Sequence, residues 1–85
     1  MITKRDAERI TDAYYEVERV LNEVDDMLLT KEEIYARFPK DSDGVPFITI
    51  SSLNNALRNM RHMRIIEVVY VRGVCHYGVN NRDRR

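Results

Sequence analysis

Residues 51–63, SSLNNALRNMRHM, separate into an apolar and a polar set at helical spacing. With successive residues placed roughly 100° apart, the apolar arc holds Leu53, Ala56, Leu57, Met60 and Met63. The opposite arc holds Ser51, Asn54, Asn55, Arg58, Arg61 and His62. This division predicts an amphipathic helix over residues 51–63, capped by Ser51 or Ser52, with its apolar arc in the core.

The next stretch, IIEVVYVRGVCHYGV at residues 65–79, predicts a β-hairpin. Arg72 and Gly73 lie in its middle and fit a two-residue turn. In that register the opposed pairs are Tyr70 with Cys75, Val68 with Tyr77 and Ile66 with Val79. These six residues then share one face of the hairpin, which we expect to be buried.

The first part of the chain predicts one long helix over residues 1–27. Its apolar stripe consists of Ile10, Tyr14, Val17, Leu21, Val24 and Leu28, widened by Ala13, Val20 and Met27. A helix from Thr3 to Asp26 would be roughly 35 Å long, which is longer than is needed to pack against the other elements. It is therefore either a long core helix or a helix whose overhang pairs with a second subunit.

A second helix is predicted over residues 30–38, because the sequence TKEE at 30–33 has the pattern of a capping box. Pro39 ends it, and residues 39–44 are rich in turn-forming residues. Residues 45–50 predict a short extended segment, with Phe47 or Ile48 and also Ile50 facing inwards. Together the segments predict an α+β fold in a single domain over residues 1–79.

The composition places limits on class and location. A chain of 85 residues that is 44% hydrophobic and 33% charged is typical of one small globular domain. Its one cysteine excludes an intrachain disulfide and favours a reducing, cytoplasmic location. No apolar run reaches the roughly 18 residues that a membrane span requires, so we expect no membrane association.

The net charge is zero, but the two halves differ in sign. Residues 1–43 carry seven Lys/Arg and twelve Asp/Glu, a net charge of −5. Residues 44–85 carry seven Arg and only Glu67 and Asp83, a net charge of +5. Arginine suits phosphates and guanine edges, so the second half is predicted to bind a polyanion. The acidic first half is a candidate surface for a protein partner.

The polar arc of residues 51–63 has the chemistry of a DNA-reading helix. Asn pairs bidentately with adenine and Arg with guanine in the major groove, a groove that admits one helix. Ser51 and Ser52 lie at the helix start, where they can donate to a phosphate. A merely solvated face is the alternative, but such faces favour Lys and Glu, whereas Asn is a poor helix former. Duplex DNA is therefore the predicted partner of this arc.

Two further basic features fit the same partner. Arg72 at the hairpin turn is a candidate contact to the minor groove or to a phosphate, although a plain turn would look the same. Residues 80–85 predict a mobile basic tail in which Arg82, Arg84 and Arg85 add attraction independent of base sequence. A tail without any role is equally consistent with the pattern.

Catalysis, cofactors and metals are not expected. Cys75 and His76 are neighbours on a predicted strand, so their side chains point to opposite faces and cannot act as nucleophile and base. With His62 they supply too few ligands for a zinc site. Asp41 and Asp43 lie in a predicted turn and lack the remainder of a calcium-binding loop.

The sequence resembles winged helix-turn-helix domains over residues 28–79. LLTKEEIYARFP is similar to the second helix of that fold, ITISSLNNALRNMRHMRIIEVV to the recognition helix and first wing strand, and YVRGVCHYGV to the wing. The sequence is most similar to the DNA-binding part of ferric-uptake-type and multiple-antibiotic-resistance-type repressors. Two features depart from them. About a dozen residues separate the second helix from Ser51, where simple members have a tight turn. The resemblance also does not extend to a metal-binding dimerisation domain.

The resemblance implies a sequence-specific transcriptional regulator. Asn54, Asn55, Arg58 and Arg61 would face the groove, and Arg72 would lie at the wing tip. A homodimer through the first helix would suit such a regulator. Winged helices also bind proteins, so the alternative is an adaptor, or a phage- or plasmid-encoded inhibitor of a host nucleic-acid-binding complex.

Overall fold

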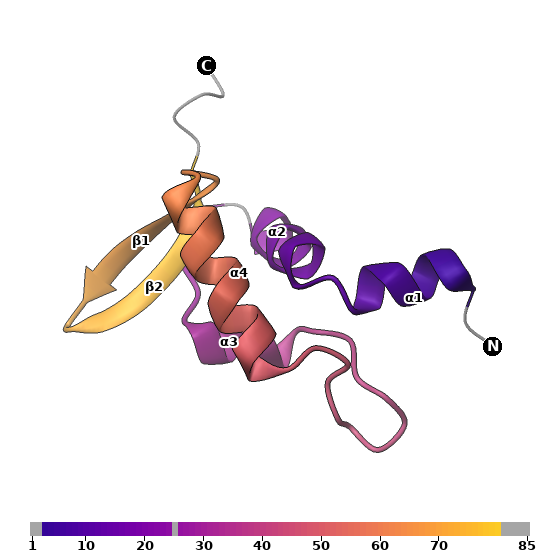
Figure 1. Ribbon diagram of the computed structural model, residues 1–85. Helices are drawn as coiled ribbons and strands as arrows, with labels where there is room; N and C mark the ends of the chain where they lie inside the picture. Colours follow the sequence, from indigo (N-terminus) through magenta and orange to yellow (C-terminus); the bar gives the residue numbers. More distant parts are fainter. Residues whose placement is uncertain (1–2, 25, 81–85) are drawn as a thin grey trace.

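The computed structural model describes residues 3–24 and 26–80. Helices come first and an antiparallel β-hairpin comes last, which confirms the α+β class (Figure 1). The elements in chain order are α1 (Lys4–Ile10), α2 (Ala13–Val24), α3 (Lys31–Ala36), α4 (Ile50–His62), β1 (Ile66–Val71) and β2 (Val74–Val79). Within the described residues, none of these helices has the length and apolar character needed to span a bilayer.

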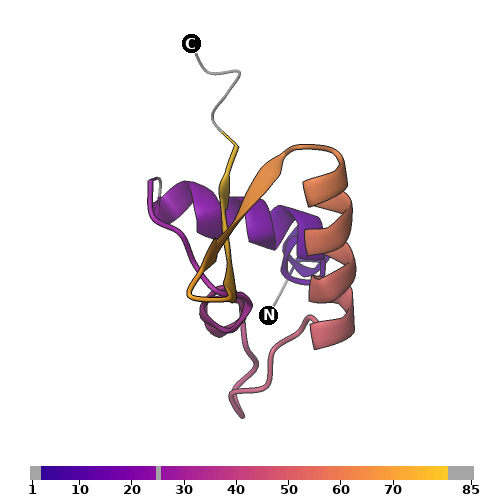
Figure 2. The same cartoon turned by 90° about the vertical axis from the view of Figure 1, so that its left-hand side faces the viewer.

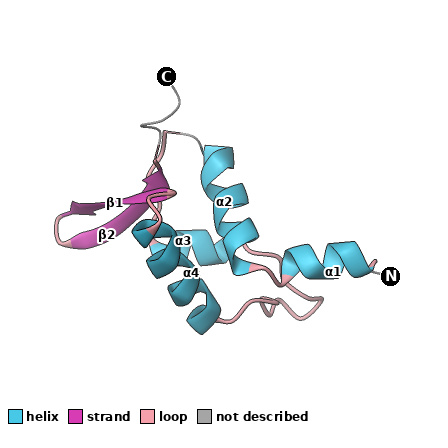
Figure 3. Ribbon diagram, turned by 45° about the horizontal axis from the view of Figure 1, so that its top comes forward, coloured by secondary structure: helices cyan, strands magenta, loops and turns pink. Residues whose placement is uncertain are grey.

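The prediction of one continuous first helix over residues 1–27 is wrong. The chain breaks after Ile10, and α2 starts anew at Ala13. The Asp12 carboxylate causes the break, because its Oδ1 accepts the backbone N–H groups of Tyr14 at 3.0 Å and Tyr15 at 3.2 Å. Aspartate is among the strongest helix N-caps, so this local bond overrides the continuous apolar stripe. Figure 3 shows α1 extending from α2 on the side away from the hairpin.

The capping box at the start of α3 is confirmed. The Thr30 hydroxyl accepts the backbone N–H of Glu33 at 3.2 Å, and Glu33 Oε1 accepts the backbone N–H of Thr30 at 2.9 Å. The helix ends at Ala36, earlier than predicted, because the backbone N–H groups of Arg37 and Phe38 bond only three residues back. Phe38 is nevertheless buried.

The helix predicted over residues 51–63 is confirmed as α4, with corrections at both ends. Thr49 caps it by accepting the backbone N–H of Ser52 at 3.2 Å, so neither Ser51 nor Ser52 is the cap. Ile50 is the first helical residue and is exposed, whereas Ile48 is buried. Four of the five predicted core residues of the arc are buried, namely Leu53, Ala56, Leu57 and Met60. Met63 is the C-cap and is 54% exposed, because the chain leaves the helix there.

The hairpin has the predicted register: Ile66 pairs with Val79, Val68 with Tyr77 and Tyr70 with Cys75. Both turn residues have positive φ, 53° at Arg72 and 78° at Gly73, which is the geometry of a type I′ turn. The prediction that the whole inner face is buried is wrong. Ile66 at the base is 3% exposed, but Tyr70 near the tip is 61% exposed. The hairpin extends beyond the helices that cover its base (Figure 1).

One core joins α2, α3, α4 and the base of the hairpin. Figure 2 shows α2 crossing behind the hairpin, with α4 along one side of it. The buried apolar residues are Ala13, Val17, Val20, Leu21, Leu29, Ile34, Phe38, Ile48, Leu53, Ala56, Leu57, Met60 and Ile66. Leu29 also exchanges backbone hydrogen bonds with Tyr77, at 3.0 and 2.7 Å, which fixes β2 to the segment before α3.

The one buried charged side chain among the described residues is Glu16 on α2. Arg19 binds it at 2.7 Å and also binds Glu23 at 2.9 Å, while its guanidinium donates to the carbonyl oxygen of Arg37 at 3.1 Å. The hydrogen bond to Glu16 raises the pKa of Arg19 above its ordinary value. A buried carboxylate needs such a partner, and here the partner also connects α2 to the end of α3.

The capping box predicts a specific pH dependence of stability. The hydrogen bond from the Thr30 backbone lowers the pKa of Glu33 below its ordinary 4.5. Its contribution is therefore complete above pH 4.5 and is lost as the pH falls through the lower folded value. Glu33→Gln keeps an acceptor but removes the charge, so its unfolding free energy should change less steeply with pH below 4.5. Equal slopes for the two proteins in acid denaturant titrations would contradict this.

Candidate nucleic-acid interface

The structure places seven of the eight predicted contact residues on α4. They are Ser51, Ser52, Asn54, Asn55, Arg58, Arg61 and His62, and all are exposed. The eighth, Arg72, is exposed at the tip of the hairpin. The polar arc of α4 is therefore not packed beneath another part of the described chain, and it is open to a partner along its length.

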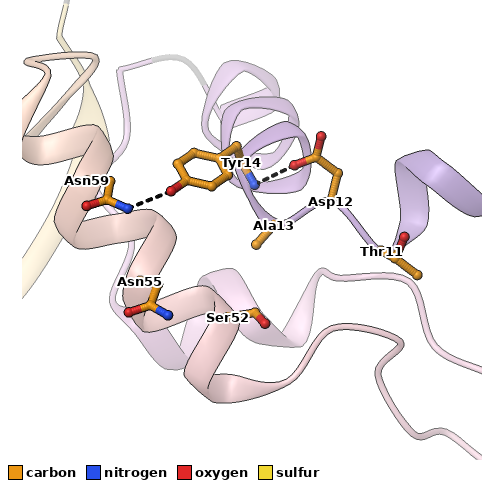
Figure 4. Close-up of a pocket in the computed structure, with 7 residues that line it drawn as sticks. All are labelled: Thr11, Asp12, Ala13, Tyr14, Ser52, Asn55 and Asn59. Atoms are coloured by element: carbon orange, nitrogen blue, oxygen red, sulfur yellow. Dashed lines mark hydrogen bonds between the residues drawn. The ribbon is translucent and has the colours of Figure 1, made fainter.

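Two hollows border this polar arc on opposite sides. The first lies between α4 and the α1–α2 junction and measures about 490 Å³. It is lined by Thr11, Asp12, Ala13, Tyr14, Ser52, Asn55 and Asn59 (Figure 4). The amide of Asn59 donates to the hydroxyl of Tyr14 at 2.6 Å, which connects α4 to the start of α2. This side of α4 thus faces a carboxylate and a phenol of its own chain.

The second hollow, which we call the helix–hairpin notch, lies between α4 and the hairpin. It measures about 170 Å³ and is lined by Asn54, Leu57, Arg58, Arg61 and Tyr77. Both charged residues in this lining are arginines. The two sides of α4 therefore differ in charge: the notch is cationic, and the side facing Asp12 is not.

Arg58 lies on the outermost part of the polar arc, and its position is restrained. Its Nη2 donates to the side-chain oxygen of Asn55 at 3.0 Å. The bond holds the guanidinium along the helix surface and reduces the conformational entropy that a contact through Arg58 would cost. Asn55 and Arg58 form a preorganised amide–guanidinium pair on the exposed face.

Tyr70 and Tyr77 adjoin this surface, although the sequence did not predict them as site residues. The hydrogen bond with Cys75 raises the pKa of Tyr70, and the nearby Arg61 opposes that shift. Burial raises the pKa of Tyr77, and Arg61 again acts in the opposite sense. The hairpin register had already placed both tyrosines on the inner face. Only the packing of α4 against β1 brings Arg61 over that face.

His76 and Asp41, which were considered above as catalytic or metal-binding residues, lie in local contacts with the backbone. The imidazole Nδ1 of His76 lies 2.9 Å from the carbonyl oxygen of Val74, and Asp41 accepts the backbone N–H groups of Asp43 and Val45 within its turn. No cluster of three or more His, Cys, Asp or Glu suited to a metal ion occurs in the described residues. Asn80 donates to the carbonyl oxygen of Arg64, while the rest of the predicted basic tail lies outside the described residues.

Comparison of this chain with models of protein families, with curated proteins and with solved structures finds no match.

The contact between Tyr70 and Cys75 can be tested in the free protein. Cys75→Ala, which removes the thiol, should lower the pKa of Tyr70 toward its ordinary 10.0, because Cys75, directly opposite on the partner strand, is the main cause of the raised value. Ultraviolet difference absorbance of the tyrosinate measures this, with Tyr70→Phe in both backgrounds assigning the signal. An unchanged titration of Tyr70 would contradict the geometry of the hairpin tip.

Proposed function

We propose that this chain is a winged helix-turn-helix protein that binds duplex DNA sequence-specifically and regulates transcription, with α4 in the major groove. The observation that carries the proposal is the division of α4 into two arcs. Leu53, Leu57 and Met60 anchor it in the core, while the arc of amides and guanidinium groups is exposed along its length. A helix held in this way presents base-reading groups with little freedom to move.

The order of elements supports the fold assignment. Over residues 28–79 the chain runs from a short helix, α3, to a longer helix, α4, and directly into an antiparallel hairpin. The resemblance to winged helices predicts the same order. The segment between α3 and α4, residues 37–49, is longer than the tight turn of simple helix-turn-helix proteins.

The contacts divide by position on the surface. Asn54, Asn55 and Arg58 are the proposed base readers, since amide and guanidinium groups form bidentate bonds with adenine and guanine. Ser51 and Ser52 lie in the first turn of α4, where their hydroxyl groups suit a phosphate, while the backbone N–H of Ser52 is already bonded to Thr49. His62 in the last turn and Arg72 at the hairpin tip extend the footprint along the backbone.

A binding selection from random oligonucleotide duplexes tests the proposal and supplies a target sequence. With that duplex, Arg58→Gln should lose ~1–3 kcal/mol of discrimination at one base position, because one bidentate contact is removed. Arg37→Gln is the matched control, since Arg37 is exposed but lies at the end of α3 rather than on α4. If the selection returns no motif and the protein does not bind heparin or DNA at low salt, the proposal is wrong.

A protein-binding adaptor or inhibitor is the second candidate, and the outer face of α2 favours it. Tyr15, Glu18, Asn22 and Glu23 line a hollow of about 380 Å³ there, together with Arg19. This face is acidic and separate from the polar arc of α4, so it suits a basic protein. Loss of a co-purifying protein in Glu18→Lys, with DNA binding unchanged, would assign the two partners to two surfaces.

We also propose a homodimer through the first part of the chain, with a shorter contact segment than the predicted long helix. Because Asp12 interrupts the predicted long first helix, the segment available to a second copy is α1, which projects beyond the core (Figure 3). Light scattering after size exclusion should give twice the 10.1 kDa chain mass. A monomer mass at all concentrations used for DNA binding would contradict it.

A further inference from the structure

The helix–hairpin notch differs from the rest of the polar surface because two elements build it. Asn54, Arg58 and Arg61 approach from α4, and Tyr77 approaches from β2. Neither arginine forms an ion pair with a carboxylate within residues 3–24 and 26–80. A notch with two guanidinium groups, an amide and a phenol, and with no acidic residue in its lining, is suited to an anion.

The hydroxyl of Tyr77 adds a donor to this cationic site. Arg61 and Tyr77 line the notch from opposite sides, one on α4 and the other on β2. Burial keeps the pKa of Tyr77 above its ordinary value, and the phenol therefore retains its proton at neutral pH. A protonated phenol and a neighbouring guanidinium group can both donate hydrogen bonds to the oxygen atoms of one bound anion.

The position of the notch identifies the anion, given the proposed function. With α4 in the major groove and Arg72 on the hairpin tip, the DNA strand that borders the groove would run across the surface where α4 and the hairpin meet. The ridge that separates adjacent grooves is the phosphate backbone, and the notch lies on this line. Arg58 also lines the notch, but its Nη2 donates to the side-chain oxygen of Asn55 at 3.0 Å, whereas no side-chain amide holds Arg61 in this way within the described residues.

We propose that the notch holds a single backbone phosphate of the bound duplex, clamped by Arg61 and by the hydroxyl of Tyr77. This inference rests on the proposed function and gives Arg61 a different role from the groove-facing one that the resemblance implies. Arg61 positions the protein on DNA, and Arg58 with Asn54 and Asn55 selects the sequence.

The test is a scan of the selected duplex with single neutral methylphosphonate substitutions, measured with wild type and Arg61→Gln. One substitution should weaken wild type roughly tenfold or more and should have a much smaller effect on Arg61→Gln, in which only Tyr77 remains to hold the phosphate. The variant should bind all duplexes more weakly by a similar factor, with its base preferences unchanged and its salt slope reduced by about 1. Tyr77→Phe should reduce the effect of the same substitution.

Arg64→Gln is the matched control, because it removes the same charge from an exposed residue just after α4 that does not line the notch. It should keep the phosphate sensitivity of wild type. Arg61→Lys keeps the charge and provides a folded comparison if Arg61→Gln fails to fold. It should keep the salt slope but lose affinity, because an ammonium group cannot form the bidentate contact.

The outcomes separate this inference from the proposed function. If wild type binds a specific duplex but Arg61→Gln loses a base preference and keeps every phosphate sensitivity, Arg61 is a base reader and the inference is wrong. The inference is also wrong if Arg61→Gln behaves like Arg64→Gln. If wild type binds no duplex at all, the proposed function itself fails.

Discussion

The apolar arc of α4 is the contact on which the rest of the structure depends. Leu53, Leu57 and Met60 are almost completely buried, and each such side chain contributes about 1.5–3 kcal/mol when it leaves water. In a chain of 85 residues these few side chains are a large share of the net stability. Their burial also fixes the rotation of the helix about its axis. The opposite arc must then face outwards, whatever residues it carries. The packing of the core therefore determines that the Asn and Arg side chains of that arc point to the solvent.

The neighbours of α4 determine how its polar arc can be used. On one side the Asn59–Tyr14 bond and the Asp12 carboxylate occupy the approach from the α1–α2 junction. On the other side the hairpin forms the notch with Arg58 and Arg61. An anionic partner is accordingly attracted to the hairpin side and repelled from the side of Asp12. The overall neutrality of the chain conceals this asymmetry. Twelve of the fourteen acidic residues precede residue 44, whereas the described arginines after it lie on α4, just after its C-terminus and on the hairpin.

Local patterns in the sequence were sufficient for several elements. The Thr30–Glu33 capping box, the hairpin register and the four buried residues of α4 each depend on residues close together in the chain. The errors arose where local and tertiary effects compete. Asp12 is a better cap than a helix-interior residue, so it divided a continuous apolar stripe. Tyr70 is exposed because the hairpin extends beyond the helices that cover its base (Figure 1). The role of Tyr77 in the notch depends on contact between α4 and the hairpin, which neither pattern contains.

We propose that the polar arc of α4 and the inner side of the hairpin form one surface for DNA. Amide chemical-shift mapping of the folded protein with the selected duplex is the decisive measurement. We expect changes concentrated on residues 49–64 and 70–77, with the outer face of α2 around Glu18 and Glu23 unaffected. Changes concentrated on α1 and α2, with the amides of α4 unchanged, would contradict it.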